Sequence, residues 1–172
     1  RESGTPLTVE VPSSIHPGAW VRVSISPIAV AEGTPPRIAL LAFDVTEEYR
    51  AKEARRQLEL LVEHSTDYIA VASLALDITY VNRAGLDLLG APSPDAMCGH
   101  SVLEQCDAEA RALLEERALP ALQTAGRWQG EITLRHLVTG DPIPVEMTAF
   151  VVTDPDTGQP LAYAGVSRPI AD

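Results

Sequence analysis

The most informative stretch of this sequence reads Arg127-Trp128-Gln129-Gly130-Glu131-Ile132-Thr133-Leu134-Arg135. Trp128, Ile132 and Leu134 share one parity along it, whereas the charged and polar residues share the other. Such a period of two is typical of a β-strand that has one face in a core and the other in water. The sequence therefore predicts a strand over residues 127–135, in a sheet that is covered on one side.

Other elements can be predicted on both sides of this strand. They are a hairpin over residues 68–81, a short helix over 83–89, a long helix over 107–124 that Pro120 kinks in its last turn, and strands over 145–152 and 161–166. Gly90 is expected to end the short helix, because glycine readily adopts the left-handed conformation that follows many helices. Two strands, helices and three further strands indicate an α+β unit with its helices gathered on one face of an antiparallel sheet.

Residues 1–46 form a separate and shorter run of strands. Residues 21–26 alternate between apolar and polar side chains, which predicts a half-buried strand. Residues 38–43 are nearly all apolar and are expected to form a central strand that is buried on both faces. A weaker strand is predicted over residues 7–11.

The connector between these regions, residues 47–63, is predicted to be helical. Thr46 is expected to cap its N-terminus, and the two glutamates that follow place negative charge at the positive end of the helix dipole. Ala54, Leu58 and Leu61 form one apolar seam on an otherwise charged helix, as in a short coiled coil. The seam is only about two heptads long, which is too short to distinguish two interpretations. The helix either pairs with the same helix of a second copy of the chain or packs on its own domain.

The composition limits the kinds of partner. Thirteen Lys and Arg residues against 24 Asp and Glu residues give a formal net charge of -11 over 172 residues. This charge disfavours binding to nucleic acid and to anionic membrane surfaces. No apolar run approaches the roughly 20 residues of a membrane helix, so we expect no membrane contact by this segment. Because the sequence begins with Arg1 rather than Met, we interpret it as an excerpt of a longer polypeptide.

The sequence shows no apparatus for catalysis or metal binding. It contains no nucleophile elbow, no HExxH, no phosphate-binding loop and no kinase signature, so we expect no enzyme activity from this segment itself. Cys98 and Cys106 lack the spacing of a zinc site. We expect them to be reduced thiols, one at least packed in a core, in a cytoplasmic protein.

A faint repeat relates the two ends of the chain. Residues 23–28 align with residues 147–152, and residues 42–46 align with residues 167–171. The predicted domains are the C-terminal strands of a first module (1–46), a helical linker (47–63) and a complete second module (64–172).

The chain resembles the PAS family of sensory domains in four segments that occur in the right order. Asp44-Val45-Thr46-Glu47 is similar to the D-[IV]-T-E ending of a PAS sheet, and Tyr80-Val81-Asn82-Arg83-Ala84 with Leu88-Leu89-Gly90 is similar to the segment YVN.A...L.G. Gly99 matches the glycine that follows the short second helix of the family. Gly126-Arg127-Trp128-Gln129-Gly130-Glu131 is similar to the segment G.W.GE at the start of the third strand. The resemblance implies a PAS-like five-stranded antiparallel sheet with helices on one face, preceded by a partial β module and a connecting helix.

The resemblance also implies a function. PAS modules sense a small ligand or a partner and relay that state through helices to an output domain, which in the bacterial members is most often a histidine kinase of a two-component system. Two alternatives are a ligand-free dimerisation module and a flavin or haem redox sensor. Residues 99–105 lack the flavin-reactive cysteine of light-sensing members. Residues 107–124 lack the axial histidine of haem-binding members, so His100 is the remaining candidate for a haem ligand. The cofactor is therefore unknown, with none expected to be covalently bound, and haem and flavin stay open.

Five residues are candidates for the functional site. Asp44 and Thr46 stand where a strand becomes a helix, and the resemblance implies that they act there as a signal-relay hinge. Asn82 is either a helix cap or a contact for a ligand. Trp128 is expected to fill core or interface volume, and His136 either faces a ligand cavity or is exposed or hydrogen-bonded near its strand end. As partners we expect a second copy of the chain, bound through the linker helix and the PAS surface, and a small-molecule ligand.

Overall fold

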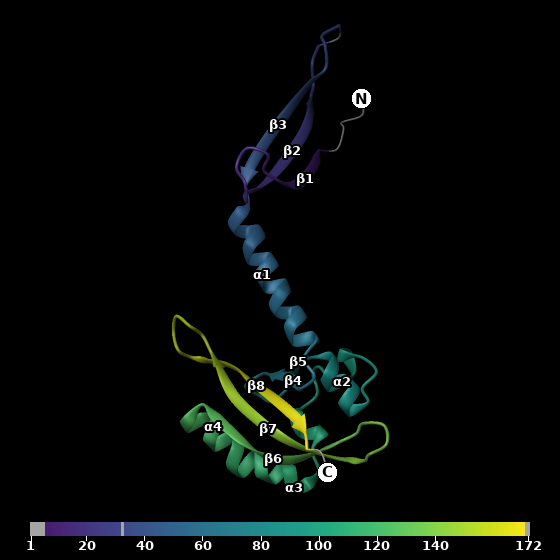
Figure 1. The fold of residues 1–172 in the computed structure, drawn as a ribbon, viewed down its shortest axis with the longest axis vertical. Coiled ribbons are helices and arrows are strands. Elements are labelled where there is room, and N and C mark those ends of the chain that lie inside the picture. Colours follow the sequence, from purple (N-terminus) through teal and green to yellow (C-terminus); the bar gives the residue numbers. More distant parts are fainter. Residues whose placement is uncertain (1–5, 32, 171–172) are drawn as a thin grey trace. The chain divides into compact units, whose positions relative to one another are not determined.

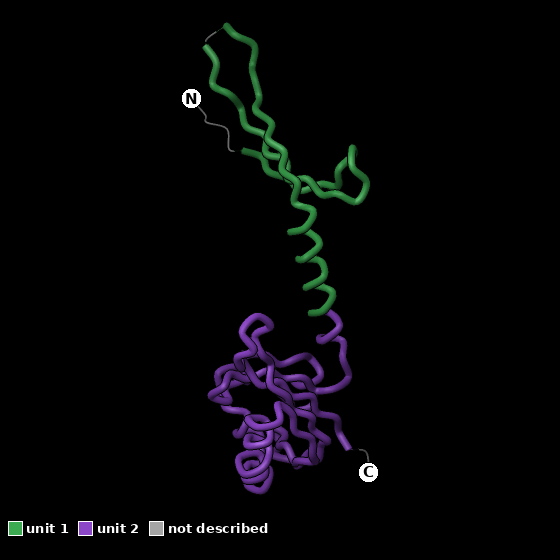
Figure 2. The backbone as a smooth tube through the Cα atoms, turned by 90° about the vertical axis from the view of Figure 1, so that its left-hand side faces the viewer, with its two compact units in different colours: residues 1–59 green, residues 60–172 purple. Residues whose placement is uncertain are grey.

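The computed structural model describes residues 6–31 and 33–170. The chain divides into two compact units, residues 1–59 and residues 60–172, which are coloured separately in Figure 2. Residues 1–5, 32 and 171–172 belong to the predicted first and last domains but lie outside the described residues. The division falls within a helix, α1 (Thr46–Glu63), so that the last turn of this helix belongs to the second unit.

The first unit contains a three-stranded antiparallel sheet (Figure 1). Its order is β1-β2-β3, with β1 at Leu7–Pro12, β2 at Trp20–Ile28 and β3 at Arg37–Asp44. Val9, Val23 and Ala42 lie opposite one another in the register, so one face of the sheet is a continuous apolar surface. The three strands predicted for this part of the chain are thus confirmed.

The environment predicted for the third strand is wrong. β3 is an edge strand rather than a central one, and β2 lies in the middle. Leu40 and Phe43, which lie on opposite faces of β3, are 59% and 55% exposed, because no second layer covers either face within the described part of the chain. The apolar face of such a partial sheet predicts packing against the connector helix or against a second copy of the chain, and within the described residues the sheet contacts this helix only at its first turn.

The second unit has a five-stranded antiparallel sheet in the order β5-β4-β8-β7-β6 (Figure 1). Its strands are β4 (Tyr68–Ala72), β5 (Ile78–Val81), β6 (Arg127–Arg135), β7 (Pro142–Thr153) and β8 (Pro160–Pro169). Its helical segments are α2 (Arg83–Leu89), η1 (Pro94–Ala96), η2 (Val102–Gln105), α3 (Ala108–Leu113), η3 (Leu114–Ala118) and α4 (Leu119–Ala125). α3 and α4 pack on β6, and α4 also contacts β7. The predicted α+β architecture is confirmed.

Local signals placed the short helix α2 correctly. The side chain of Asn82 accepts a hydrogen bond from the backbone N–H of Gly85, and Gly90 adopts the left-handed conformation at the other end, with a φ of 69°. The helix therefore begins and ends where its capping residues require.

The long helix predicted over residues 107–124 is interrupted. α3 and α4 are joined by η3, a π-helical segment in which the N–H of Leu119 bonds to the carbonyl of Leu114, five residues back. Pro120 follows in the first turn of α4 and has no N–H to donate to the preceding turn. The wider π turn just before Pro120 accommodates this missing bond, so the irregularity precedes the proline rather than bending the last turn.

The hydrophobic core of the second unit lies between its sheet and its helices. Its fully buried side chains include Ile78, Leu89, Met97 and Val145. Over residues 6–31 and 33–170, no helix has both the length and the apolar character that a membrane crossing needs.

Candidate functional site

A cavity of about 80 Å³ lies between the inner face of the second sheet and the helices. Its walls come from four strands, from η2 and from the segment that contains η3 and α4. Its lining includes Tyr68, Ala70, Gln105, Cys106, Ala118, Met147, Ala149 and Gly165. The cavity exists because small residues occupy the middle of the sheet: Ala70, Gly165 and Ala149 form one row across β4, β8 and β7.

One hydrogen bond joins two of the polar groups on the cavity wall. The Tyr68 hydroxyl donates to Oε1 of Gln105 at 2.8 Å, and both side chains are buried. The Nε2 atom of Gln105 is also buried but has no hydrogen-bond partner. Among the described buried side chains, it is the one nitrogen or oxygen atom without a hydrogen bond. A buried donor without a partner costs free energy, which an acceptor on a ligand would recover.

The cavity is electrically neutral. Burial raises the pKa of Tyr68 above its ordinary value and raises the pKa of the Cys106 thiol to about 11, so both groups are protonated at neutral pH. Among the described residues that line the cavity, none is an Asp, Glu, Lys, Arg or His. A charged ligand would lose its hydration there without gaining a counter-charge.

Asn82 ties the beginning of this unit together. Its side chain is fully buried, and Oδ1 accepts from the N–H groups of Ile69 and Gly85 at 2.9 and 3.1 Å. Its Nδ2 donates to the carbonyls of Val62 and Asp67 at 3.0 and 2.9 Å. All four hydrogen-bonding positions of the amide are therefore used. One side chain connects the last turn of α1, the start of β4 and the first turn of α2.

Two further contacts surround this connection. Glu63, at the end of α1, accepts hydrogen bonds from the Tyr80 hydroxyl and from the backbone N–H of Arg83. Asp67 forms a two-bond ion pair with Arg168 near the end of β8, with distances of 3.0 and 2.7 Å. The guanidinium of Arg168 lowers the pKa of Asp67. Asp67, which directly precedes Tyr68, is therefore bonded both to Arg168 near the end of β8 and to Asn82, which is in turn bonded to the last turn of α1.

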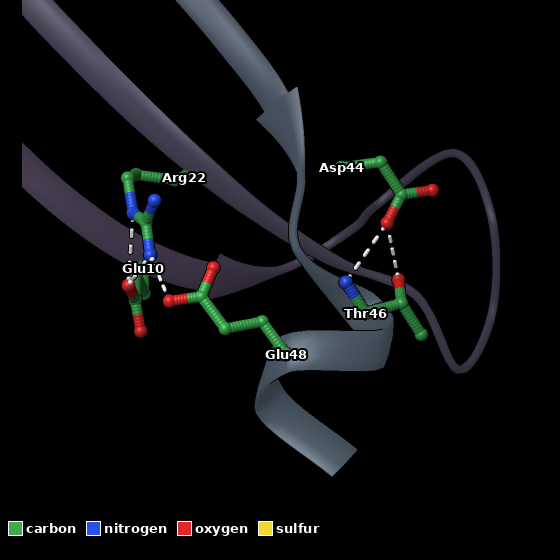
Figure 3. Close-up of polar contacts among 5 residues, drawn as sticks. All are labelled: Glu10, Arg22, Asp44, Thr46 and Glu48. Carbon is green, nitrogen blue, oxygen red and sulfur yellow. Dashed lines mark hydrogen bonds and ion pairs between the residues drawn. The ribbon is translucent and has the colours of Figure 1, made fainter. Parts of the chain in front are cut away.

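In the first unit, Asp44 and Thr46 form the hydrogen-bonded junction drawn in Figure 3. Oδ1 of Asp44 accepts from the N–H of Thr46 at 2.9 Å and from its hydroxyl at 2.5 Å. The hydroxyl oxygen of Thr46 in turn accepts from the N–H of Trp20 at 2.9 Å. Bonds from the hydroxyl and the N–H of Thr46 lower the pKa of Asp44. Thr46 is thus the first residue of α1 and not its cap, because its hydroxyl is bonded to Asp44 and β2.

The first turn of α1 makes two more contacts with the sheet. Arg22 forms ion pairs with Glu10 of β1 and with Glu48 of α1, at 2.9 and 2.8 Å (Figure 3). The rings of Trp20 and Tyr49 stack with their centroids 3.6 Å apart. The start of α1 is therefore held to its sheet by polar and aromatic contacts.

The structure separates Asn82, Trp128 and His136 from the cavity, since none of them lies on its lining. The ring of Trp128 lies over Gly130, where an added Cβ would be 2.5 Å from Cζ2 of the ring. The His136 ring occupies the space over Gly90 in the same way, and its Nδ1 accepts from the N–H of Thr139 at 3.2 Å. These contacts give a packing reason for the glycines in the two family-like segments.

The apolar seam of α1 is open. Ala54 is exposed, and Leu58 and Leu61 are 64% and 70% exposed. The structure therefore does not favour a seam that packs on its own domain.

Sequence reasoning missed the residues that line or adjoin the cavity. Gln105 carries no local signal of burial, because it directly follows Glu104 in a segment of mixed polarity. Asp67 and Arg168 are 101 positions apart, and neither carries a local signal. Tyr68 could be predicted as a strand residue, but its hydroxyl partner could not.

Comparison with known proteins identifies the second unit. A family model described as the PAS fold matches residues 62–172. No protein in a search of curated proteins matches the chain.

Several solved PAS domains share the fold. The PAS domain of a protein from Colwellia psychrerythraea has 21% identity and a TM-score of 0.63, covering 68% of this chain and 97% of that one. The PAS domain of an HTR-like protein from Haloarcula marismortui has 25% identity and a TM-score of 0.60, covering 72% and 98%. A PAS domain from a two-component sensor histidine kinase has 13% identity and a TM-score of 0.56, covering 70% and 99%.

Proposed function

Because this chain belongs to the PAS family, we propose that it is the sensory part of a larger signalling protein and responds to a small molecule in the cavity of its second unit. The observation that carries this proposal is a continuous series of contacts. Tyr68 lines the cavity, its neighbours Asp67 and Ile69 bond to Asn82, and Asn82 bonds to Val62 in the last turn of α1. A ligand that displaces Tyr68 would act directly on the attachment of this helix.

The size of the cavity favours a small ligand over a flavin or haem. Pockets for drug-sized ligands enclose about 300 to 1,000 Å³, whereas this one has about 80 Å³. An absorption spectrum of the freshly purified protein tests this point. A band at wavelengths above the protein absorption would favour the redox-sensor alternative.

A cavity-filling substitution tests the relay without a known ligand. Ala118→Val adds two methyl groups inside the cavity, and Ala110→Val makes the same change at a buried helical position that does not line it. We expect Ala118→Val to change the hydrogen exchange of residues 60–64, and Ala110→Val to leave it unchanged. Equal effects of the two variants, or no effect of Ala118→Val, would contradict the relay.

As output we propose a histidine kinase, the output most often attached to PAS modules and present in one structural relative. Both cysteines are free thiols, in keeping with a reducing compartment such as the cytoplasm. In the full-length protein, Asp44→Ala removes both bonds that Asp44 accepts from Thr46. We expect regulation of the output to be lost while the PAS unit stays folded. Retained regulation would show that the junction plays no part in the relay.

A second proposed role is dimerisation through α1. The exposed seam of Ala54, Leu58 and Leu61 could pack against the same seam of a second copy. Native mass spectrometry should show a dimer that Leu58→Lys weakens and that Gln57→Lys, at an adjacent exposed position, leaves intact. A monomer at all concentrations would contradict this role, and added mass beyond the chain would instead indicate a bound ligand.

A further inference from the structure

We infer that the cavity selects a compact, uncharged and largely apolar molecule with a hydrogen-bond acceptor, which binds the free amide N–H of Gln105. This inference rests on the proposed function, because it assumes that the cavity binds a ligand. It adds the chemical class of that ligand and the atom that recognises it. Ketone, ester and ether oxygens are acceptors of the required kind.

The volume sets the size of the ligand. An apolar cavity of about 150 Å³ accepts benzene, which has six carbon atoms. With about 80 Å³, the present cavity has room for a molecule of roughly three to five non-hydrogen atoms. Larger ligands would have to push aside the side chains of the helical wall.

The wall sets the polarity of the ligand. Its lining is apolar apart from a few neutral polar groups, and no charged side chain is among the described lining residues. An anion or a cation would therefore enter without a partner of opposite charge. Neutral molecules avoid this cost.

The hydrogen-bond pattern sets the kind of polar group. The Tyr68 hydroxyl donates to Oε1 of Gln105, and Nε2 of Gln105 is the one fully buried side-chain nitrogen or oxygen without a partner among the described residues. If the amide were rotated by half a turn, its N–H would point to Tyr68, and both the Tyr68 proton and the amide oxygen would lack partners. The observed orientation leaves fewer groups unsatisfied, and what it leaves is a donor. The matching group on a ligand is an acceptor.

Two probes of nearly identical shape test this inference. Cyclobutanone carries a carbonyl oxygen, and methylenecyclobutane carries a CH₂ group in its place. Affinities for the whole chain are measured from NMR shifts of the Met147 methyl group, which lies on the cavity wall. Because the alkene is more hydrophobic than the ketone, each probe is compared between variants rather than with the other probe.

The variants keep the Tyr68 hydroxyl from masking the effect. In a Gln105→Met protein the hydroxyl would lose its acceptor and could itself bind the ketone. The comparison therefore uses Tyr68→Phe and the double variant Tyr68→Phe/Gln105→Met. We expect the second change to weaken cyclobutanone binding by about 3- to 10-fold, the net value of one hydrogen bond, and to change methylenecyclobutane binding by less than about twofold.

The outcomes separate this inference from the proposed function. If both probes bind and Gln105→Met affects them equally, or affects neither, the role of the Gln105 amide is wrong while the ligand cavity stands. If neither probe shifts the Met147 signal in the wild-type chain at concentrations near its solubility limit, the cavity is no ligand site and both proposals fail. The NMR signal of the Gln105 side-chain amide in the wild-type chain provides an independent test. A shift of this signal with cyclobutanone but not with methylenecyclobutane supports the inference.

Discussion

Replacing Asn82 by alanine should destabilise the second unit far more than the loss of an ordinary helix cap. The side chain makes four hydrogen bonds and is 0% exposed. At a net value of about 1 kcal/mol for each bond, Asn82→Ala should lower the free energy of unfolding by about 4 kcal/mol. This is a large share of the roughly 5 to 15 kcal/mol of a typical domain.

The matched control is Asp107→Ala. Asp107 caps α3 through a single bond to the N–H of Ala110 at 2.8 Å, so its loss should cost about 1 kcal/mol. Urea denaturation measures both variants in a Trp20→Phe background, where Trp128 is the sole tryptophan and reports on the second unit alone. The expected difference between the variants is therefore about 3 kcal/mol.

A second variant separates the tether from the cap. Asn82→Asp keeps the acceptor toward Ile69 and Gly85 but places an oxygen opposite the carbonyls of Val62 and Asp67. Hydrogen exchange should then accelerate in the last turn of α1 and much less in α2. The reasoning is refuted if Asn82→Ala costs no more than Asp107→Ala, or if Asn82→Asp leaves α1 as protected as before.

Two further predictions concern the junction and the sheet. The pKa of Asp44 is lowered in the folded state, so its carboxylate stabilises the junction at pH values above its ordinary pKa of about 3.9. This contribution is lost as the pH falls through the lower pKa of the folded state. In a Trp128→Phe background, Trp20 fluorescence should show an acid transition that Asp44→Asn reduces. An alanine at position 130 would place its Cβ 2.5 Å from Cζ2 of Trp128, so Gly130→Ala should displace the ring. We expect the free energy of unfolding to fall by about 1 to 3 kcal/mol and the near-ultraviolet circular dichroism to change. An unchanged spectrum and stability would contradict the packing reason given for this glycine.

The elements that could be predicted from the sequence are those specified by neighbouring residues. The bounds of α2 follow from Asn82 and Gly90, which satisfy or end the helix within one turn. β6 spans the predicted residues because alternation alone marks a half-buried strand. The PAS family could be predicted too, since its motifs are local segments in a fixed order.

The features that could not be predicted depend on residues far apart in the sequence. The exposure of β3 depends on whether another layer covers it, and its apolar run is the same in either case. The residues next to Thr46 predict a helix cap, whereas its hydroxyl oxygen accepts a hydrogen bond from the N–H of Trp20, 26 residues earlier. The partners of Gln105 and Asp67 are likewise brought close only by the folded sheet.

The position of Tyr68 has a consequence for how this family of sequences can diverge. Its ring occupies the space that any side chain at Gly85 would need, and its hydroxyl occupies one end of Gln105. A side chain at position 85 therefore requires a smaller residue at position 68, and the loss of the Tyr68 hydroxyl removes the partner of Gln105. In an alignment of close relatives, positions 68, 85 and 105 should covary, and relatives that recognise different ligands should differ at this set together.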